Sequence, residues 1–233
     1  MLVLATILRA VIIKMAEFAL ISSRSRFARF IMIPIVFQYF ITYVLVQLLA
    51  TFDLRDWGIF GTETSFFNAF EIGIYKDFTS NWFIDAGYLI KQIMFYNILM
   101  PPLEFCAYWL WRYLWRIVDQ RSIFVSQYKK TRCTSIQQFT ETYAGGEFYI
   151  HYKYAYIASC CFITMTFGPI MPVLFWYCLL SLCSLYFVER MAMIYSYRKP
   201  PMYGDHLTVF LLKLLSLAPF LYITLALWAF SNQ

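Results

Sequence analysis

The chain has 233 residues, of which 61% are hydrophobic and only 14% are charged, and its formal net charge is +6. A soluble domain of this length is about a quarter charged and just under half apolar. Because the apolar residues also stand in long blocks instead of alternating with polar ones, the composition excludes an ordinary soluble protein and indicates a polytopic, all-α membrane protein.

Several blocks of about 20 residues carry few charges or none, which is long enough to cross a hydrocarbon layer of about 30 Å. In chain order, six spans are predicted at about 2–22, 30–52, 80–115 (kinked at 101–102), 154–172, 173–194 and 207–230. Polar connectors are expected at 53–79 and 118–152. The whole chain, 1–233, is interpreted as a single transmembrane domain.

The first span contains three charged residues: Arg9, Lys14 and Glu17. Lys14 and Glu17 are three residues apart and can pair with each other on one helix. Arg9 has no partner within its own helix, so we expect it to face the bundle interior or a wet cavity.

Lysine and arginine then predict the orientation, because cytoplasmic loops hold an excess of them. The loops 23–29, 112–153 and 190–206 are basic, whereas the connector 53–79 is mostly acidic. Six alternating crossings bring every basic loop to the same side, with the N-terminus outside. The positive charge is therefore interpreted as inner-face anchoring, and no nucleic-acid partner is expected.

Polar residues follow one side of the third span. Five of them recur at spacings of four, three, four and four: Asn81, Asp85, Tyr88, Gln92 and Tyr96. Such spacing puts all five on one helical face, and Glu104 adds a carboxylate beyond the prolines. These acceptors are pore-lining candidates, since they can replace water around a cation. Hydrogen bonding between helices is the alternative interpretation.

The second span offers Gln38 and Thr42 as further pore-lining candidates, on a polar face that can pack against the stripe of the third span. Gly87, Pro101 and Pro102 are hinge candidates for a gate, because proline in a helix interior removes a hydrogen bond and introduces a kink.

Motifs for catalysis or metal binding are not found in the sequence. Five of the six cysteines lie in apolar segments without a CxxC pair, and the two histidines stand alone. HExxH, GxSxG and Gly-rich phosphate-loop motifs are also missing. We therefore predict no catalytic residue, no metal site, no cofactor and no enzymatic activity.

Three segments resemble a known family: "KMAEFALISSRSRFARFIMIPIVFQYF", the stretch from "EFYIHYKYAYIASCC" to "FVERMAMIYSY", and "RKPPMYGDHL". Their order and pattern are similar to the calcium-permeable, stress-gated (OSCA-type) cation channels of the wider anoctamin-like superfamily, with a tail like that of protist members. The resemblance implies an eleven-helix fold in which these six spans match the fourth to ninth helices. The third span would then correspond to the helix that lines the pore and moves during gating.

The chain departs from that family at both ends, so it is interpreted as a fragment of a larger channel or as a reduced paralogue. Its expected function is the pore-side region of a mechanically or osmotically gated, calcium-permeable cation channel in the plasma membrane or an internal membrane. Expected partners are the lipid bilayer, permeant cations, and a second copy or the missing parts of a larger chain. A lipid scramblase and a non-conducting accessory subunit are the alternatives.

Overall fold

The computed structural model describes residues 11–12, 14–15, 18, 24–51, 75, 78–120, 131–146, 148–198 and 205–231. Every named element in these ranges is a helix, accompanied by an isolated bridge between Gly146 and Tyr197. The predicted all-α class is therefore confirmed for the described residues. Most of the first predicted span, with Arg9 and Glu17, lies outside them, as does most of the connector 53–79.

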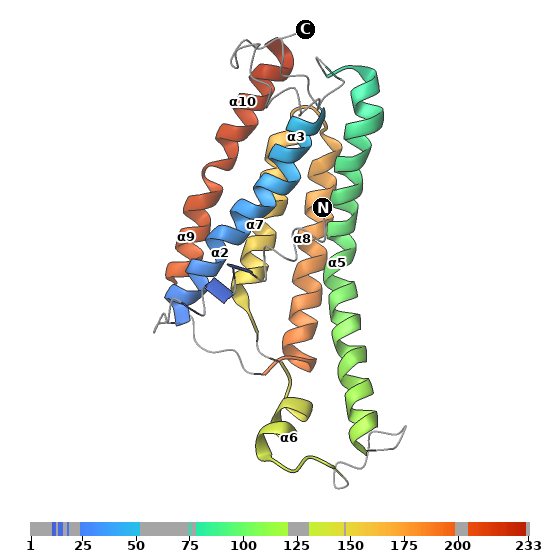
Figure 1. Ribbon diagram of the computed structural model, residues 1–233. Coiled ribbons are helices and arrows are strands. Elements are labelled where there is room, and N and C mark those ends of the chain that lie inside the picture. The colour runs from blue at the N-terminus through green and yellow to red at the C-terminus, as the bar shows by residue number, and fades with distance from the viewer. Residues whose placement is uncertain are drawn as a thin grey trace, which may run out of the picture. The chain divides into compact units, whose positions relative to one another are not determined.

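The helices are α2 (Arg24–Phe40), the π-helical turn η1 (Ile41–Leu45), α3 (Val46–Thr51), α5 (Ser80–Gln120), α6 (Ile136–Tyr143), α7 (Ile150–Phe167), α8 (Val173–Tyr195), α9 (His206–Leu215) and α10 (Ala218–Ser231) (Figure 1). The chain divides into two compact units, which are described separately. Unit 1 comprises residues 1–94, 150–178 and 203–233, and unit 2 comprises 95–149 and 179–202.

Within the described residues, three helical stretches are both long and apolar enough to cross a membrane: Arg26–Thr51, Val173–Tyr195 and Leu207–Ser231. They agree with the spans predicted at 30–52, 173–194 and 207–230. The helices α5 and α7 carry more polar residues, and the crossings predicted at 80–115 and 154–172 stay predictions. A helical protein with several segments that can span a membrane is the conclusion that these residues support.

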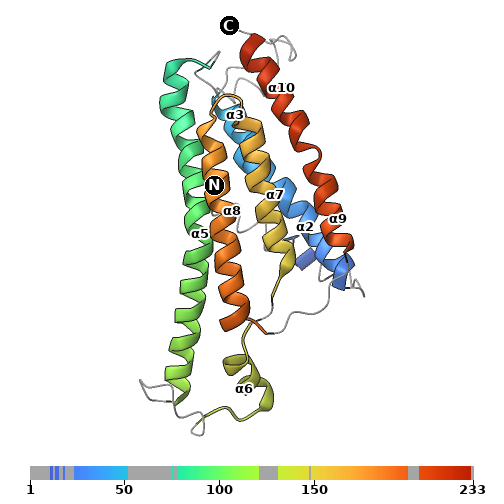
Figure 2. The same ribbon diagram turned by 180° about the vertical axis from the view of Figure 1, so that it is seen from behind.

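The core of unit 1 forms around α7, which packs against α2, η1, α9 and α10 (Figure 2). Small buried residues of α7, such as Ala155 and Ala158, let the neighbouring backbones approach closely. The buried hydroxyls of Thr164 and Thr166 donate to carbonyls one turn earlier in α7, at 2.8 Å and 2.7 Å. These two hydroxyls are therefore satisfied within their own helix.

A second apolar cluster of unit 1 buries one face of α5. Four residues of that face recur every fourth position: Trp82, Ala86, Ile90 and Met94. They pack against residues of η1, α7, the α7–α8 turn, α8 and α10: Val44, Ile163, Phe167, Met171, Leu174 and Leu225. The indole N–H of Trp82 donates to the hydroxyl of Thr51 at 3.3 Å, so the one polar atom of this large side chain is also satisfied.

In unit 2, α5 continues through Pro101 and Pro102 without ending. Pro102 has no N–H, so the carbonyl of Ile98, four residues earlier, loses its ordinary donor. The hydroxyl of Ser184 in α8 donates to this carbonyl at 2.9 Å. A side chain from a second helix thus replaces the hydrogen bond that proline removes.

Replacing Ser184 by alanine should lower the free energy of unfolding by about 0.5–1.5 kcal/mol, because it leaves the carbonyl of Ile98 without a donor. The same change should cost less in a Pro102→Ala background, where residue 102 regains its N–H. Thermal unfolding in detergent of the two single variants and the double variant measures this difference. Equal costs in both backgrounds would show that Ser184 does not compensate for Pro102.

Candidate functional site

The polar stripe of α5 lies on the side opposite the buried face. Asn81, Asp85 and Tyr88 of unit 1 are exposed, and the Tyr88 side chain is 59% exposed. Gln92 is half-buried. In unit 2, Tyr96 and Glu104 are exposed as well. In unit 1 the predicted stripe is therefore present on one side of α5, and there it faces away from the apolar cluster that buries the other side of this helix.

Asp85 is the stripe residue with the clearest interaction, since the hydroxyl of Tyr75 donates a hydrogen bond to its Oδ2 atom. Tyr75 precedes α5 in the chain. The hydrogen bond to Asp85, followed by burial and by the charge of that carboxylate, raises the pKa of Tyr75 above its ordinary value of 10.0. Tyr75 therefore keeps its proton at neutral pH and remains a donor to Asp85.

Gln38 and Thr42 lie elsewhere in unit 1. Their side chains are only 6% and 7% exposed, in α2 and η1 respectively. Because the stripe of α5 stays exposed, the polar face of the second span does not cover it. The structure brings Asn81, Asp85 and Tyr88 together on one surface but leaves Gln38 and Thr42 out of it.

The hinge candidate Gly87 is buried in unit 1 against Met171. A Cβ atom at this position would lie 3.3 Å from the sulfur and 3.4 Å from the terminal methyl of Met171. Glycine thus lets α5 approach the α7–α8 turn closely, which gives the residue a packing role. Movement at Gly87, Pro101 or Pro102 during gating stays a prediction.

Replacing Gly87 by alanine should leave the melting temperature unchanged or slightly raised. Alanine is favoured over glycine in a helix by about 1 kcal/mol, and the flexible end of Met171 can move a few tenths of an ångström. Gly87→Leu should lower the melting temperature, because the branched end of leucine overlaps Met171. Adding Met171→Ala to this variant should restore part of the lost stability. Asn81→Leu, on the exposed side of α5, is the matched control. An alanine variant that unfolds as readily as the leucine variant would contradict this packing role.

Unit 2 contains a second candidate site at the C-terminal end of α6, which the sequence analysis missed. The helix begins after Ser135, whose side-chain oxygen accepts the backbone N–H of Gln138 at 3.2 Å. The last carbonyls of a helix have no donor within it. In α6 the carbonyls of Thr142 and Tyr143 accept hydrogen bonds from arginine side chains, and the Thr140 carbonyl accepts a third arginine in addition to the backbone N–H of Ala144. We call this group the arginine junction: Arg112, Arg116 and Arg198 with the carbonyls of Thr140, Thr142 and Tyr143.

The three arginines of the junction together reach three carbonyls, and the Thr142 carbonyl also accepts the Nε–H of Arg116 at 3.5 Å. The bonds run from Arg112 Nη2 to Thr142 O at 3.1 Å, from Arg116 Nη2 to Tyr143 O at 3.3 Å, and from Arg198 Nη2 to Thr140 O at 3.0 Å. Positive charge near a helix C-terminus also interacts favourably with the helix dipole. The junction therefore holds the end of α6 by both hydrogen bonding and charge.

Two glycines allow the chain to approach the junction. Gly145 has a φ of 91°, and a Cβ atom there would lie 2.6 Å from the carbonyl oxygen of Ser196. A Cβ atom on Gly146 would overlap the hydroxyl of Tyr108. The other nitrogen of the Arg112 fork, Nη1, donates to Tyr108 Oη at 3.2 Å and to the Ser196 carbonyl at 3.1 Å. Both glycines are thus required by close packing around Arg112.

Asp119 borders the junction but bonds to other groups. Its carboxylate accepts the hydroxyl of Tyr143 at 2.7 Å, the backbone N–H of Arg132 at 3.0 Å and the thiol of Cys133 at 3.6 Å. Burial opposes ionisation of Asp119, but these hydrogen bonds outweigh it and hold the pKa of the carboxyl below its ordinary value of 3.8. The ionised carboxylate thus ties the segment after α5 to α6.

Asp119→Asn should lower the melting temperature at neutral pH. It should also make the melting temperature fall less steeply as the pH is lowered. A carboxyl whose pKa is lowered by folding contributes stability that is fully present above its unfolded pKa, and that stability is lost as the pH falls through the folded value. Thermal unfolding between about pH 6 and pH 3 measures both effects. Asp205→Asn is the control, because the Asp205 side chain forms no capping hydrogen bond with α9. Parallel acid profiles for the native protein and Asp119→Asn would contradict the assignment.

The sequence does contain signals for the junction. Arg112 and Arg116 are one helical turn apart on α5, Ser135 is a favourable N-cap, and Gly145-Gly146 follows α6. In the sequence these arginines indicate only the inner face of the membrane. Their acceptors lie 30 and 27 residues further along the chain, so spacing alone does not reveal them.

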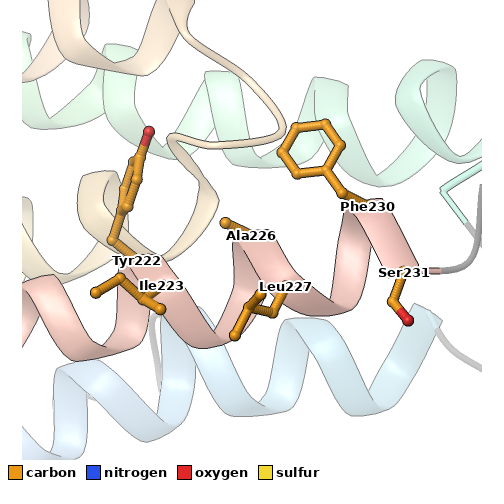
Figure 3. Close-up of a pocket in the computed structure, with 6 residues that line it drawn as sticks. All are labelled: Tyr222, Ile223, Ala226, Leu227, Phe230 and Ser231. Atoms are coloured by element: carbon orange, nitrogen blue, oxygen red, sulfur yellow. The ribbon is translucent and has the colours of Figure 1, made fainter.

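A shallow pocket of about 360 Å³ lies on α10 in unit 1 (Figure 3). All six residues that line it belong to that one helix: Tyr222, Ile223, Ala226, Leu227, Phe230 and Ser231. Most of these side chains are apolar, as is typical of a helix surface that faces lipid. Among the described residues, no group of three or more His, Cys, Asp or Glu side chains is arranged to hold a metal ion.

Comparison of the chain with protein-family models, with curated proteins and with solved structures finds no match.

Proposed function

We propose that this chain is the pore-side part of a cation-conducting membrane assembly, in which the polar stripe of α5 lines a water-filled path that another polypeptide completes. The exposed stripe opposite a fully packed apolar face is the observation that carries the proposal. Polar and ionised side chains are costly in hydrocarbon unless protein or water covers them. A stripe whose polar side chains are exposed on the outer side of the helix therefore requires a wet or proteinaceous surface beside it.

The chemistry of the stripe favours cations. Asp85 and Glu104 supply carboxylates, Gln92 an amide oxygen, and Tyr88 a hydroxyl, all of which are ligands for hard cations. Gating by tension or osmotic stress and permeability to calcium are the finer parts of the proposal. Their support is the resemblance of the sequence to stress-gated channels.

An accessory role in a larger membrane assembly is the second candidate. The aromatic side chains on the same surface favour it, because Tyr88 and Tyr96 are 59% and 50% exposed and offer large areas for packing against a neighbouring helix. In that case the stripe forms hydrogen bonds with a partner and no ion passes along it.

The first test is ion flux through the purified protein, with any polypeptide that co-purifies, after reconstitution in liposomes under an osmotic gradient. Asp85→Asn and Glu104→Gln should each reduce cation flux severalfold, because each removes a negative charge from the path. Tyr75→Phe should leave flux nearly unchanged, since it removes the hydrogen bond to Asp85 but keeps the carboxylate. Thr224→Ala, at an exposed position of α10, is the control for an exposed polar substitution outside the stripe.

The outcomes separate the alternatives. Flux that neither carboxylate variant alters would rule out the stripe as a cation path. Movement of labelled lipid between leaflets, abolished by the same variants, would assign the stripe to lipid transport. No flux at all, with a larger partner present at fixed stoichiometry, would favour the accessory role.

A further inference from the structure

The arginine junction has no part in the proposed cation path, and its charge is not balanced. Its three guanidinium groups form no ion pair with a carboxylate in the part of the chain that the structure describes. Asp119, which borders it, bonds to Tyr143, Arg132 and Cys133 instead. Three positive charges therefore converge on neutral carbonyl oxygens.

The cost of this arrangement is visible at Arg116. Burial, and then the positive charge of Arg112, lower the pKa of Arg116 below its ordinary value. Both effects disfavour the charged form of the side chain. An anion within the junction would offset both, since it would replace lost solvation and screen the two guanidinium groups from each other.

Donor groups also remain for such an anion. Arg116 bonds through Nε and Nη2, which leaves Nη1 without a partner among the described residues. The Nε atom of Arg198 is buried and has no hydrogen-bond partner there either. A buried donor without an acceptor calls for a bound water or ion. The forked, planar guanidinium group suits the oxygens of phosphate in particular.

We infer that the arginine junction binds the phosphate group of an anionic lipid headgroup or of a soluble phosphate ester, chiefly through Arg116 and Arg198. All three arginines belong to loops or helix ends that the distribution of positive charge assigns to the cytoplasmic surface, where anionic lipids are abundant. Bound phosphate would link the end of α5, the end of α6 and the segment after α8 within unit 2. This inference stands independently of the proposed cation path.

Arginine-directed modification of the native protein tests the inference without any substitution. The protein in zwitterionic detergent is treated with phenylglyoxal alone, with phosphatidic acid, or with inorganic phosphate, and the modified residues are mapped by mass spectrometry. Arg116 and Arg198 should be protected severalfold. Arg190, which is exposed and donates to the hydroxyl of Tyr186, should not be protected. Protection by phosphatidic acid alone assigns the site to lipid headgroups, and equal protection by inorganic phosphate assigns it to soluble phosphates.

Substitutions give a second, independent measurement. Binding of phosphatidic acid to the protein in phosphatidylcholine nanodiscs should weaken about tenfold in Arg116→Gln, which corresponds to about 1.4 kcal/mol, and less in Arg116→Lys, which keeps the charge but loses the fork. Arg190→Gln removes the same charge outside the junction and should bind normally. An equal loss of affinity for phosphatidic acid in Arg116→Gln and Arg190→Gln would show that general surface charge, and not the arginine junction, binds the lipid. Equal modification of all three mapped arginines in every condition would overturn the inference.

Discussion

The packing of unit 2 depends on side chains that donate hydrogen bonds to backbone carbonyls at interrupted or terminal positions of its helices. A carbonyl that is buried in the protein and lacks a helical donor needs a donor from another part of the protein. The carbonyl of Ile98 obtains one from Ser184, and the end of α6 obtains several from Arg112, Arg116 and Arg198. In both cases the donor is a side chain from a distant part of the sequence. These hydrogen bonds therefore hold the helices of unit 2 to one another.

In unit 1, packing determines which side of α5 remains open. Trp82 and Met94 belong to an apolar face that is buried against α7 and its neighbours, and Gly87 allows that approach. Since the burial of large side chains stabilises a fold by about 1.5–3 kcal/mol each, this face fixes the rotation of the helix. The polar stripe is turned outward as a consequence, without any interaction of its own being required.

The features that could be predicted from the sequence are those set by local pattern. The length of apolar blocks predicts the stretches near 30–52, 173–194 and 207–230, and the repeat of Asp85, Tyr88 and Gln92 predicts a common helical face. Pattern does not say what that face meets, because the answer depends on tertiary packing. For the same reason it suggested that Gln38 and Thr42 would pack against the stripe, whereas both side chains are buried in unit 1 and the stripe stays exposed.

The glycine and proline residues of α5 also show that sequence pattern does not reveal tertiary contacts. From sequence, Gly87, Pro101 and Pro102 all indicate flexibility, since each weakens a helix in isolation. The structure contains a specific contact for two of them: Met171 packs on Gly87, and Ser184 donates to the carbonyl that Pro102 leaves open. A residue that weakens an isolated helix can therefore be accommodated by a specific contact in the folded protein. Movement of α5 relative to Met171 would change the first contact, and movement relative to Ser184 would change the second.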